Sequence, residues 1–526
     1  MRRVMPLFPC LCGATLLAQD PSGTVRGIVR DASTGSPLPF AAVVLEPSSP
    51  QLGAAADSLG RFVLKDAPVG LFAVKASAVG YEALTVQEVW VRSGKESIVD
   101  LALKPSRIEL EAVVVGSVDR WWEGRALDAR TFTVEQGLRY PAMFQDPARL
   151  VAATPGVSSP NDQANHLMVR GNGPNANTWL LEGAEIVSPN HLGNAGTASD
   201  LPTLSGGGVN ILSAQMLGPS RLRIGVMPAW HGNALGGIMD MELRQGNAQQ
   251  REWTAQAGLL GIDISTEGPI GRAGKAFHLV NYRYSTLGLL SAMGVDIGEE
   301  AITFQDLAFH AGTRIGERGY LRLFGMGGLS SNVFKARTDA AGWVNDKDSR
   351  DIAYAGNMGA VGATVLLPLA ARAQLRATAA WSAAYQDREE TERDTLAIAP
   401  PGLAFASLYE RKLSGIARVE GSAGARLRYA VGISAMERAI INTLQDTAAG
   451  WLLRPFAQAT YAINERLEAH AGLAFSHATF YGASLPEPRG GLRARLELLA
   501  HLLHRRDVGA VVQVHVRDLR PRLREV

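Results

Sequence analysis

The chain has 526 residues, a formal net charge of +2, 19% charged residues and a mean hydropathy of +0.02. This near-neutral balance argues against a nucleic-acid partner, which usually requires a basic surplus. No window contains the roughly 20 consecutive apolar residues that a transmembrane helix needs. The 56 glycines favour a chain of strands and turns, so any membrane crossing would use a barrel of strands.

Residues 1–19 have the pattern of an export signal, with a basic start, a mostly apolar run over 4–17 and a cleavage region at 18–20. The alternatives are a disordered N-terminus and a lipid-attached one. Both cysteines, Cys10 and Cys12, lie within this segment. The mature chain would therefore carry none, which excludes disulfides, cysteine-bound zinc and a cysteine nucleophile.

Residues 23–104 alternate short strands of period 2 with turn-forming residues. About seven strands in roughly eighty residues is typical of a β-sandwich. The stretches GTVRGIVRDASTGSPLPFAAVVLEP and DSLGRFVLKDAPVG resemble the carboxypeptidase regulatory-like domain, which implies a transthyretin-like sandwich. The sequence has no His-x-x-Glu or His-Glu-x-x-His pair for a catalytic zinc. We therefore expect a structural or docking role, with no catalytic residues, metal or cofactor.

The linker at 105–120 contains a candidate TonB box. Acidic residues precede a valine triplet and Gly116, an order that resembles the segment before the plug of TonB-dependent receptors. An extended segment of this kind can add a strand to a partner's sheet edge through backbone hydrogen bonds. The resemblance implies a TonB-type energy-coupling protein as partner; alternatively, 112–115 form a further strand of the sandwich or plug. The candidate residues are Glu109, Leu110, Glu111, Ala112, Val113, Val114 and Val115.

Residues 128–246 contain three stretches that resemble, in the same order, the plug domain of TonB-dependent receptors. DPARLVAATPGV predicts a short helix with Asp146 as its N-cap and Pro147 in its first turn. MVRGNGPNANTWLLEGAEIVSPNHLG predicts two strands around a glycine-rich turn, and PAWHGNALGGIMDMELRQGN belongs to a closing hairpin. The expected strands are 166–170, 178–181, 221–226 and 237–243.

The glycine-rich turn also matches part of a dinucleotide-binding fingerprint, Gly171-x-Gly173-x-x-Ala176. That fingerprint needs a helix to begin at the turn, so that the amides of the helix face a pyrophosphate. The residues that follow, 178–181, are strand-like instead. The turn interpretation is therefore favoured over nucleotide binding.

Two groups of plug residues are candidate site residues. Those with an expected structural role are Arg170, Gly171, Glu182 and Gly183. A charge in a narrow lumen is costly unless it is paired, so we expect Arg170 to pair with Glu182 or with Glu267 of the barrel. Those in loops that could face an extracellular ligand are Asn190, His191 and Asn210, against the alternative of solvated turns. His191 alone does not indicate iron.

Residues 251–495 alternate apolar and polar residues over stretches of about ten residues, which is typical of transmembrane barrel strands. The stretch STEGPIGRAGKAFHLVNYRYSTLGLL resembles the first barrel hairpin of the receptors. Polar stretches at 336–350 and 387–399 are expected to form long loops. We expect about ten strands, whereas complete outer-membrane transporters close with 22.

Residues 496–526 lose this alternation and become rich in leucine, histidine and arginine. They end at Glu525-Val526, without the terminal aromatic residue that outer-membrane assembly usually recognises. We expect a frameshift or truncation near residue 495. The alternative is a genuine short barrel with a soluble tail.

The sequence thus predicts a mainly β fold, with a sandwich, an α+β plug and a partial antiparallel transmembrane barrel. The resemblance implies TonB-dependent active transport of a scarce ligand, such as a siderophore or glycan, across the bacterial outer membrane, with the sandwich in the periplasm. Expected partners are a TonB-type energy-coupling protein, outer-membrane lipid and an unknown extracellular ligand. The alternatives are a non-transporting outer-membrane binding or assembly protein and a non-functional truncated receptor.

Overall fold

The computed structural model describes five ranges of the chain. These are 22–103, 129–132, 146–191, 201–496 and 510–515, with gaps at 33–34, 49, 94, 160–164, 219, 226, 233, 259–260, 272–273, 286–299, 317–318, 337–342, 344–345, 371, 393–402, 425, 444–446 and 465–466. The expected export signal and the TonB-box candidate, 109–115, lie outside the described residues. Contacts divide the chain into two compact units, Met1–Arg30 with Pro37–Ser117, and the remainder.

The first unit contains eight strands in the part that the structure describes. They are β1 (Ser22–Asp31), β2 (Ala42–Glu46), β3 (Leu52–Ala55), β4 (Arg61–Pro68), β5 (Gly70–Ser77), β6 (Leu84–Val91), β7 (Glu96–Ile98) and β8 (Leu101–Leu103). One sheet has the order β4-β1-β7, with β8 also on β1, and the other has the order β3-β2-β5-β6. Alternate residues of β1, including Val25 and Val29, are buried and pack with Phe62 and Leu101 in one apolar core. The predicted sandwich is confirmed.

The plug is built on a five-stranded sheet. Its order is β13 (Ala184–Ile186), β12 (Thr178–Leu181), β17 (Ile238–Met241), β16 (Ser220–Arg223) and β9 (Ala129–Phe132). Strands β12 and β17 pair in parallel, and the other neighbours are antiparallel. The remaining elements are α2 (Pro147–Ala152), η1 (Pro174–Ala176), and two ladders, β10 (Val157–Ser158) with β11 (Met168–Val169) and β14 (Asn190–His191) with β15 (Val209–Asn210). All four strands expected in this domain are present, three of them with shorter bounds.

Helix α2 begins where the sequence predicts. The side chain of Asp146 accepts a hydrogen bond from the amide of Ala148 at 2.8 Å, and Pro147 occupies the first turn. A proline costs nothing there because its missing N–H would have no partner inside the helix. The same carboxylate accepts from Asn165 Nδ2 at 2.9 Å and from the amide of Asn210 at 3.0 Å. The cap therefore ties the helix to two loops of the plug.

Two tight turns of the plug use the same backbone chemistry. Arg170 and Gly171 have φ values of 51° and 79°, and Glu182 and Gly183 have 53° and 88°. Positive φ at both central residues is the signature of the type I′ turn, which matches the twist of the strands that it joins. The Glu182 turn joins β12 to β13, whose residues Leu181 and Ala184 face each other. All four of these residues thus occupy central positions of tight turns.

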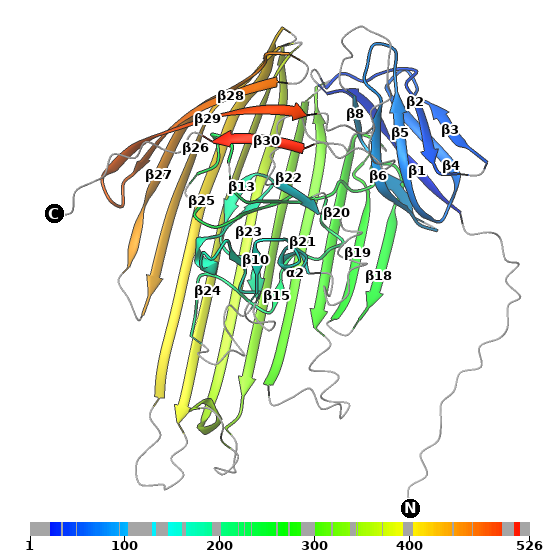
Figure 1. Ribbon diagram of the computed structural model, residues 1–526. Coiled ribbons are helices and arrows are strands. Elements are labelled where there is room, and N and C mark those ends of the chain that lie inside the picture. Colours follow the sequence, from blue (N-terminus) through cyan, green and yellow to red (C-terminus); the bar gives the residue numbers. More distant parts are fainter. Residues whose placement is uncertain are drawn as a thin grey trace, which may run out of the picture. The chain divides into compact units, whose positions relative to one another are not determined.

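The barrel part of the chain forms one antiparallel sheet, of which the structure describes thirteen strands in sequence order (Figure 1). They are β18 (Glu252–Ala257), β19 (Gly261–Pro269), β20 (Ala276–Ser285), β21 (Glu300–Ile315), β22 (Gly319–Phe334), β23 (Arg350–Ala370), β24 (Ala373–Glu392), β25 (Leu403–Ala423), β26 (Leu427–Asn442), β27 (Ala448–Ala462), β28 (Leu467–Ala478), β29 (Ala483–Leu496) and β30 (Ala510–His515). A short 3-10 helix, η3 (Asp346–Ser349), precedes β23.

Two sequence expectations about these strands need correction. The count exceeds the ten that we expected, because glycine- and alanine-rich strands such as β22 and β23 carry little apolar alternation. The stretch 387–392 belongs to β24, where we expected a loop. Strands β21 to β25 have 16 to 21 residues, well above the about 9–11 that cross a bilayer, so their ends tolerate charged residues. Strand β30 lies within the tail that was expected to lose its strand pattern.

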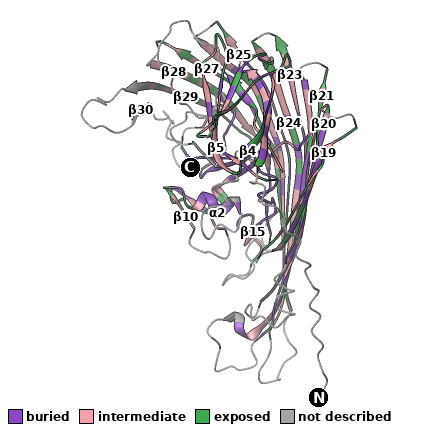
Figure 2. Cartoon of the chain, turned by 90° about the vertical axis from the view of Figure 1, so that its right-hand side faces the viewer, coloured by how far each residue is buried: buried purple, intermediate pink, exposed green. Residues whose placement is uncertain are grey.

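The two faces of the barrel sheet differ in burial (Figure 2). On β24, Trp381 is 46% and Tyr385 36% exposed, whereas Thr378 and Ser382 are buried. The plug contacts the buried side, so the exposed apolar side faces away from it and suits hydrocarbon. None of the described helices is long and apolar enough to span a membrane.

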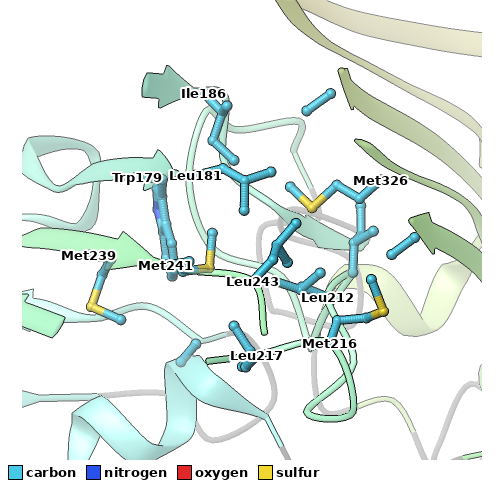
Figure 3. Close-up of a cluster of buried hydrophobic side chains, with 14 of the residues drawn as sticks. Trp179, Leu181, Ile186, Leu212, Met216, Leu217, Met239, Met241, Leu243 and Met326 are labelled. Carbon is cyan, nitrogen blue, oxygen red and sulfur yellow. The ribbon is translucent and has the colours of Figure 1, made fainter. Parts of the chain in front are cut away.

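Plug and barrel share one apolar core (Figure 3). Leu181, Ile186, Leu212 and Met241 of the plug are at most 1% exposed and belong to the same cluster as Met326 of β22. Methionine fills irregular gaps of this kind because its side chain is unbranched and polarisable. The plug is therefore packed onto the barrel wall as well as hydrogen-bonded to it.

Candidate functional site at the plug–barrel interface

His191 on β14 meets Asp306 on β21 across this interface. Its Nε2 lies 3.1 Å from Asp306 Oδ2, which also accepts from Nε and Nη2 of Arg283 at 3.0 and 2.7 Å. Arg283 Nη2 donates in turn to the carbonyl of Asn210, at 2.5 Å. The side chains of His191 and Asp306 are 2% and 1% exposed. We call these four residues the His191 cluster.

The three residues expected to face a ligand lie inside this interface. Asn190, His191 and Asn210 are 7%, 3% and 1% exposed. Asn190 and Asn210 face each other in the β14–β15 ladder, and Asn210 Nδ2 donates to Asn190 Oδ1 at 3.3 Å. Asn210 Oδ1 accepts from the amide of Leu212 at 2.9 Å. All three residues are therefore buried rather than solvated, and a ligand-facing role for them stays a prediction.

The charge state of His191 follows from its surroundings. Burial is the largest influence and lowers the pKa of His191; Asp306 raises this pKa, Arg283 lowers it and Asp146 raises it, with a net lowering. The ring is therefore neutral near pH 7. A neutral ring that carries its proton on Nε2 can donate it to Asp306 Oδ2, which lies 3.1 Å away.

Glu182 is the second buried plug residue with a defined anchor. Its Oε1 accepts from the amide of Leu243 at 2.8 Å, and its Oε2 lies 4.0 Å from Nη1 of Arg322 on β22. Burial alone raises the pKa of Glu182, but Arg322, His310 and Arg376, together with the Leu243 amide, outweigh it and hold the pKa below its usual value. Glu182 is thus an ionised group held between plug backbone and barrel arginines.

Glu267 on β19 is bound by an arginine that follows the last plug strand. Nη1 and Nη2 of Arg244 donate to its two oxygens at 2.8 and 2.9 Å, a bidentate pair, and the amide of Asn247 donates at 2.9 Å. His310 Nδ1 lies 2.8 Å from the carbonyl of Arg244. The contacts that anchor Glu182 and Glu267 therefore come from Arg322 and Arg244, and the pairing of Arg170 stays a prediction.

A third contact joins β13 of the plug to strands β24 and β25. Lys412 Nζ donates to Glu185 Oε1 at 2.8 Å, and Ser414 Oγ donates to the Glu185 carbonyl at 2.6 Å. The amide of Val187 donates to Ser382 Oγ at 3.1 Å. A plug strand is therefore bonded to barrel side chains through both its backbone and its charge.

Sequence reasoning missed the barrel side of these contacts, namely Arg283, Asp306, Arg322 and Lys412. Each lies on a strand whose outward positions are apolar, so an inward charge at period 2 was the available signal. Among the described residues, no group of three or more histidine, cysteine, aspartate or glutamate side chains could hold a metal ion. What this arrangement can do is hold a folded plug by discrete charged contacts on the inner side of a barrel wall.

The comparisons with known proteins cover both units. Residues 24–104 match the family model of the carboxypeptidase regulatory-like domain. The siderophore receptor PirA from Acinetobacter baumannii has 13% identity and a TM-score of 0.50, over 70% of this chain and 59% of its own. The FrpB iron transporter from Neisseria meningitidis has 13% identity and a TM-score of 0.50, over 70% of this chain and 63% of its own.

A ferric enterobactin receptor from Pseudomonas aeruginosa aligns with 14% identity and a TM-score of 0.50, over 71% of this chain and 60% of its own. No curated protein sequence matches the chain. The chain therefore spans less than two thirds of the length of these receptors, and the likeness concerns the fold. The protein combines a carboxypeptidase regulatory-like domain with a plug and barrel strands that have the fold of the siderophore receptor PirA and the FrpB iron transporter.

Proposed function

We propose that the protein takes part in TonB-coupled uptake of a scarce ligand across the outer membrane, with a siderophore as the leading class. The observation that carries this proposal is a plug with a sheet of its own, held on the inner side of the barrel strands by the His191 cluster, Glu182 and Glu185. In a closed barrel, a plug in this position would block passage until it shifts. Uptake then needs a source of force on the plug.

The order of the plug strands supports a route for that force. Strand β9 is the first described element after the linker at 105–120, and it lies at the edge of the plug sheet. It pairs only with β16 among the described strands, over four residue pairs. A pull on the linker would load this edge strand first, and ladder bonds at an edge can break one pair at a time. Strand addition by a TonB-type protein at 109–115 is the coupling that we propose.

The ligand class is inferred from the neighbours in fold, whose names specify siderophores, enterobactin and iron. A glycan or another scarce solute remains the second class. On this proposal the sandwich lies in the periplasm and the barrel strands contact outer-membrane lipid. Uptake of this kind requires no covalent chemistry from the protein.

The test is uptake of iron-55 bound to a panel of siderophores, including enterobactin, by cells that express the full chain and lack their own siderophore receptors. The proposal predicts accumulation above the empty-vector level with at least one siderophore, and its loss in a strain without TonB. Surface binding that is equal in both strains, without accumulation, contradicts it. That result would identify a non-transporting binding or assembly protein, and absence of the chain from the outer membrane would indicate a non-functional receptor.

A further inference from the structure

A pocket lies between a plug turn and strands β25, β26 and β27 of the barrel. It encloses about 540 Å³ of empty space, part of which is continuous with solvent. Trp230, His231 and Gly232 belong to its plug wall, together with residues of β12, β13 and β17, and Ser414 and Arg454 belong to its barrel wall. This pocket contains none of the His191 cluster residues, so it is a feature additional to that anchor.

Arg454 on β27 lines this space, and its guanidinium lies against Gly232, which also lines it. The residue is 2% exposed; its Nη2 donates to Glu487 Oε2 at 2.7 Å and its Nε donates to Ser476 Oγ at 2.9 Å. Nη1 is buried and has no hydrogen-bond partner among the described residues. A guanidinium has five N–H donors, two of them on Nη1. Buried donors in native proteins are almost always satisfied, so a group in the pocket is expected to accept from Nη1.

The charges around Arg454 do not cancel. Glu487 is shared by two guanidiniums, because Arg489 Nη2 also donates to it, at 2.9 Å. The carboxylate that lines the pocket, Glu185, is already paired with Lys412 at 2.8 Å. The surplus charge at this wall is therefore positive and belongs to the Arg454–Arg489 pair, which favours an anionic occupant.

The plug turn is held firmly against this wall. The amide of His231 donates to the carbonyl of Pro228 at 3.0 Å, and the amide of Ala229 donates to Gln458 Oε1 at 2.8 Å. Arg489 Nη1 donates to the carbonyls of Met227 and Pro228. A Cβ on Gly232 would overlap the guanidinium of Arg454, so the two are in direct contact. An occupant of the pocket would consequently touch plug and barrel at once.

We propose that this pocket is an oxyanion subsite, in which a carboxylate or phosphate group accepts hydrogen bonds from Nη1 of Arg454. The subsite deepens the proposed uptake function and rests on it for the identity of the cargo, a ligand that carries acidic groups. Because the subsite bridges plug and barrel, movement of the plug would open it. Binding itself needs no energy coupling.

The test is a titration of the full chain in detergent micelles with citrate and with inorganic phosphate, at constant ionic strength set by chloride. Tryptophan fluorescence is the readout, because Trp230 lines the pocket. We expect a saturable change with at least one of the two anions, which Trp230→Phe removes. Saturation by phosphate only or by citrate only identifies the preferred oxyanion. No saturable response to either anion overturns the proposal.

The decisive variant is Arg454→Gln, which we expect to lower the affinity for the anion at least tenfold. The matched control is Arg411→Gln, which alters an arginine of β25 whose side chain is 48% exposed and paired with Glu437, and which should bind like wild type. Gly232→Ala keeps Arg454 but displaces its guanidinium, so it should also lower the affinity for the anion at least tenfold. This variant replaces Arg454→Gln in the test if Arg454→Gln does not fold. Unchanged affinity in a folded variant contradicts the subsite. The titration contains no TonB. A failure of the uptake experiment in cells would therefore not affect the result of the anion titration.

Discussion

His191 of the plug and Asp306 of the barrel are separated by 115 positions in the chain, yet their Nε2 and Oδ2 atoms lie 3.1 Å apart in a buried contact. Asp306 also holds Arg283, so one carboxylate neutralises the barrel cation and orients the plug histidine. A buried pair is a weak contributor to net stability, but removing one partner leaves an uncompensated charge. The His191 cluster should therefore be sensitive to single substitutions.

Asp306→Asn removes the charge opposite Arg283 and keeps the shape of the side chain. We expect the free energy of unfolding to fall by about 3–5 kcal/mol, because a buried guanidinium loses its counter-charge. Urea unfolding in detergent micelles measures the change. Glu437→Gln is the control, because its pair with the half-exposed Arg411 should contribute only about 0–1 kcal/mol. Equal losses in the two variants would show that the His191 cluster has no special role.

Acid should weaken the fold through His191. The pKa of this buried ring is below its unfolded value of 6.5, so the unfolded state binds the proton more tightly. The stabilisation is fully present above pH 6.5 and is lost as the pH falls below it, by at most about 1.4 kcal/mol per pH unit. The quantity to measure is the difference in unfolding free energy between wild type and His191→Gln. Subtraction removes the contribution of all other titrating groups, and a difference that stays constant from pH 7.5 to 5.5 would refute this prediction.

The turn that joins β12 to β13 should not tolerate a side chain at Gly183. This glycine has a φ of 88° and nothing within 4 Å of an added Cβ, so Gly183→Ala tests backbone strain alone. We expect a loss of about 1–2 kcal/mol. Gly173→Ala is matched, since its Cβ also meets nothing but its φ is −62°, and it should be neutral or stabilising by about 0.4–1 kcal/mol. Similar effects of the two substitutions would disprove the turn assignment.

Glu185 and Lys412 should be coupled across the interface. Each single reversal, Glu185→Lys or Lys412→Glu, places like charges about 3 Å apart and should loosen the plug, whereas the double reversal restores the pair. Limited proteolysis of the linker-to-plug segment reports how firmly the plug is held. We expect faster cleavage in both single variants and wild-type rates in the double variant. Additive acceleration in the double variant would mean that the two residues act independently.

Local chemistry made the plug elements predictable. The strand at 178–181 has the bounds that the sequence indicates, because a turn rich in glycine precedes it and Glu182-Gly183 ends it. The cap at Asp146 followed from an aspartate directly before a proline at a helix start. Such signals extend over a few residues and need no knowledge of the rest of the fold.

The partners of the plug residues could not be predicted in this way. Arg283 and Asp306 lie opposite each other because β20 and β21 pair in one particular register, and register is set by the whole sheet. His191 then meets Asp306 only because the plug packs on that part of the wall. We expected His191 in an exposed loop because we considered its segment in isolation. Long-range packing buries this residue instead.

The most direct test of TonB coupling compares two double substitutions in the linker, during uptake of whichever siderophore the iron-55 panel shows to accumulate. Val113→Pro with Val114→Pro removes backbone donors from the candidate TonB box, and because strand pairing uses alternate residues, one of the two must face the partner. The control, Gly116→Pro with Ser117→Pro, introduces two prolines just outside the candidate TonB box. We expect the first variant to bind ligand at the cell surface but to accumulate it no faster than cells without TonB, and the second to accumulate it at the wild-type rate. Wild-type accumulation by the first variant would contradict coupling through this segment.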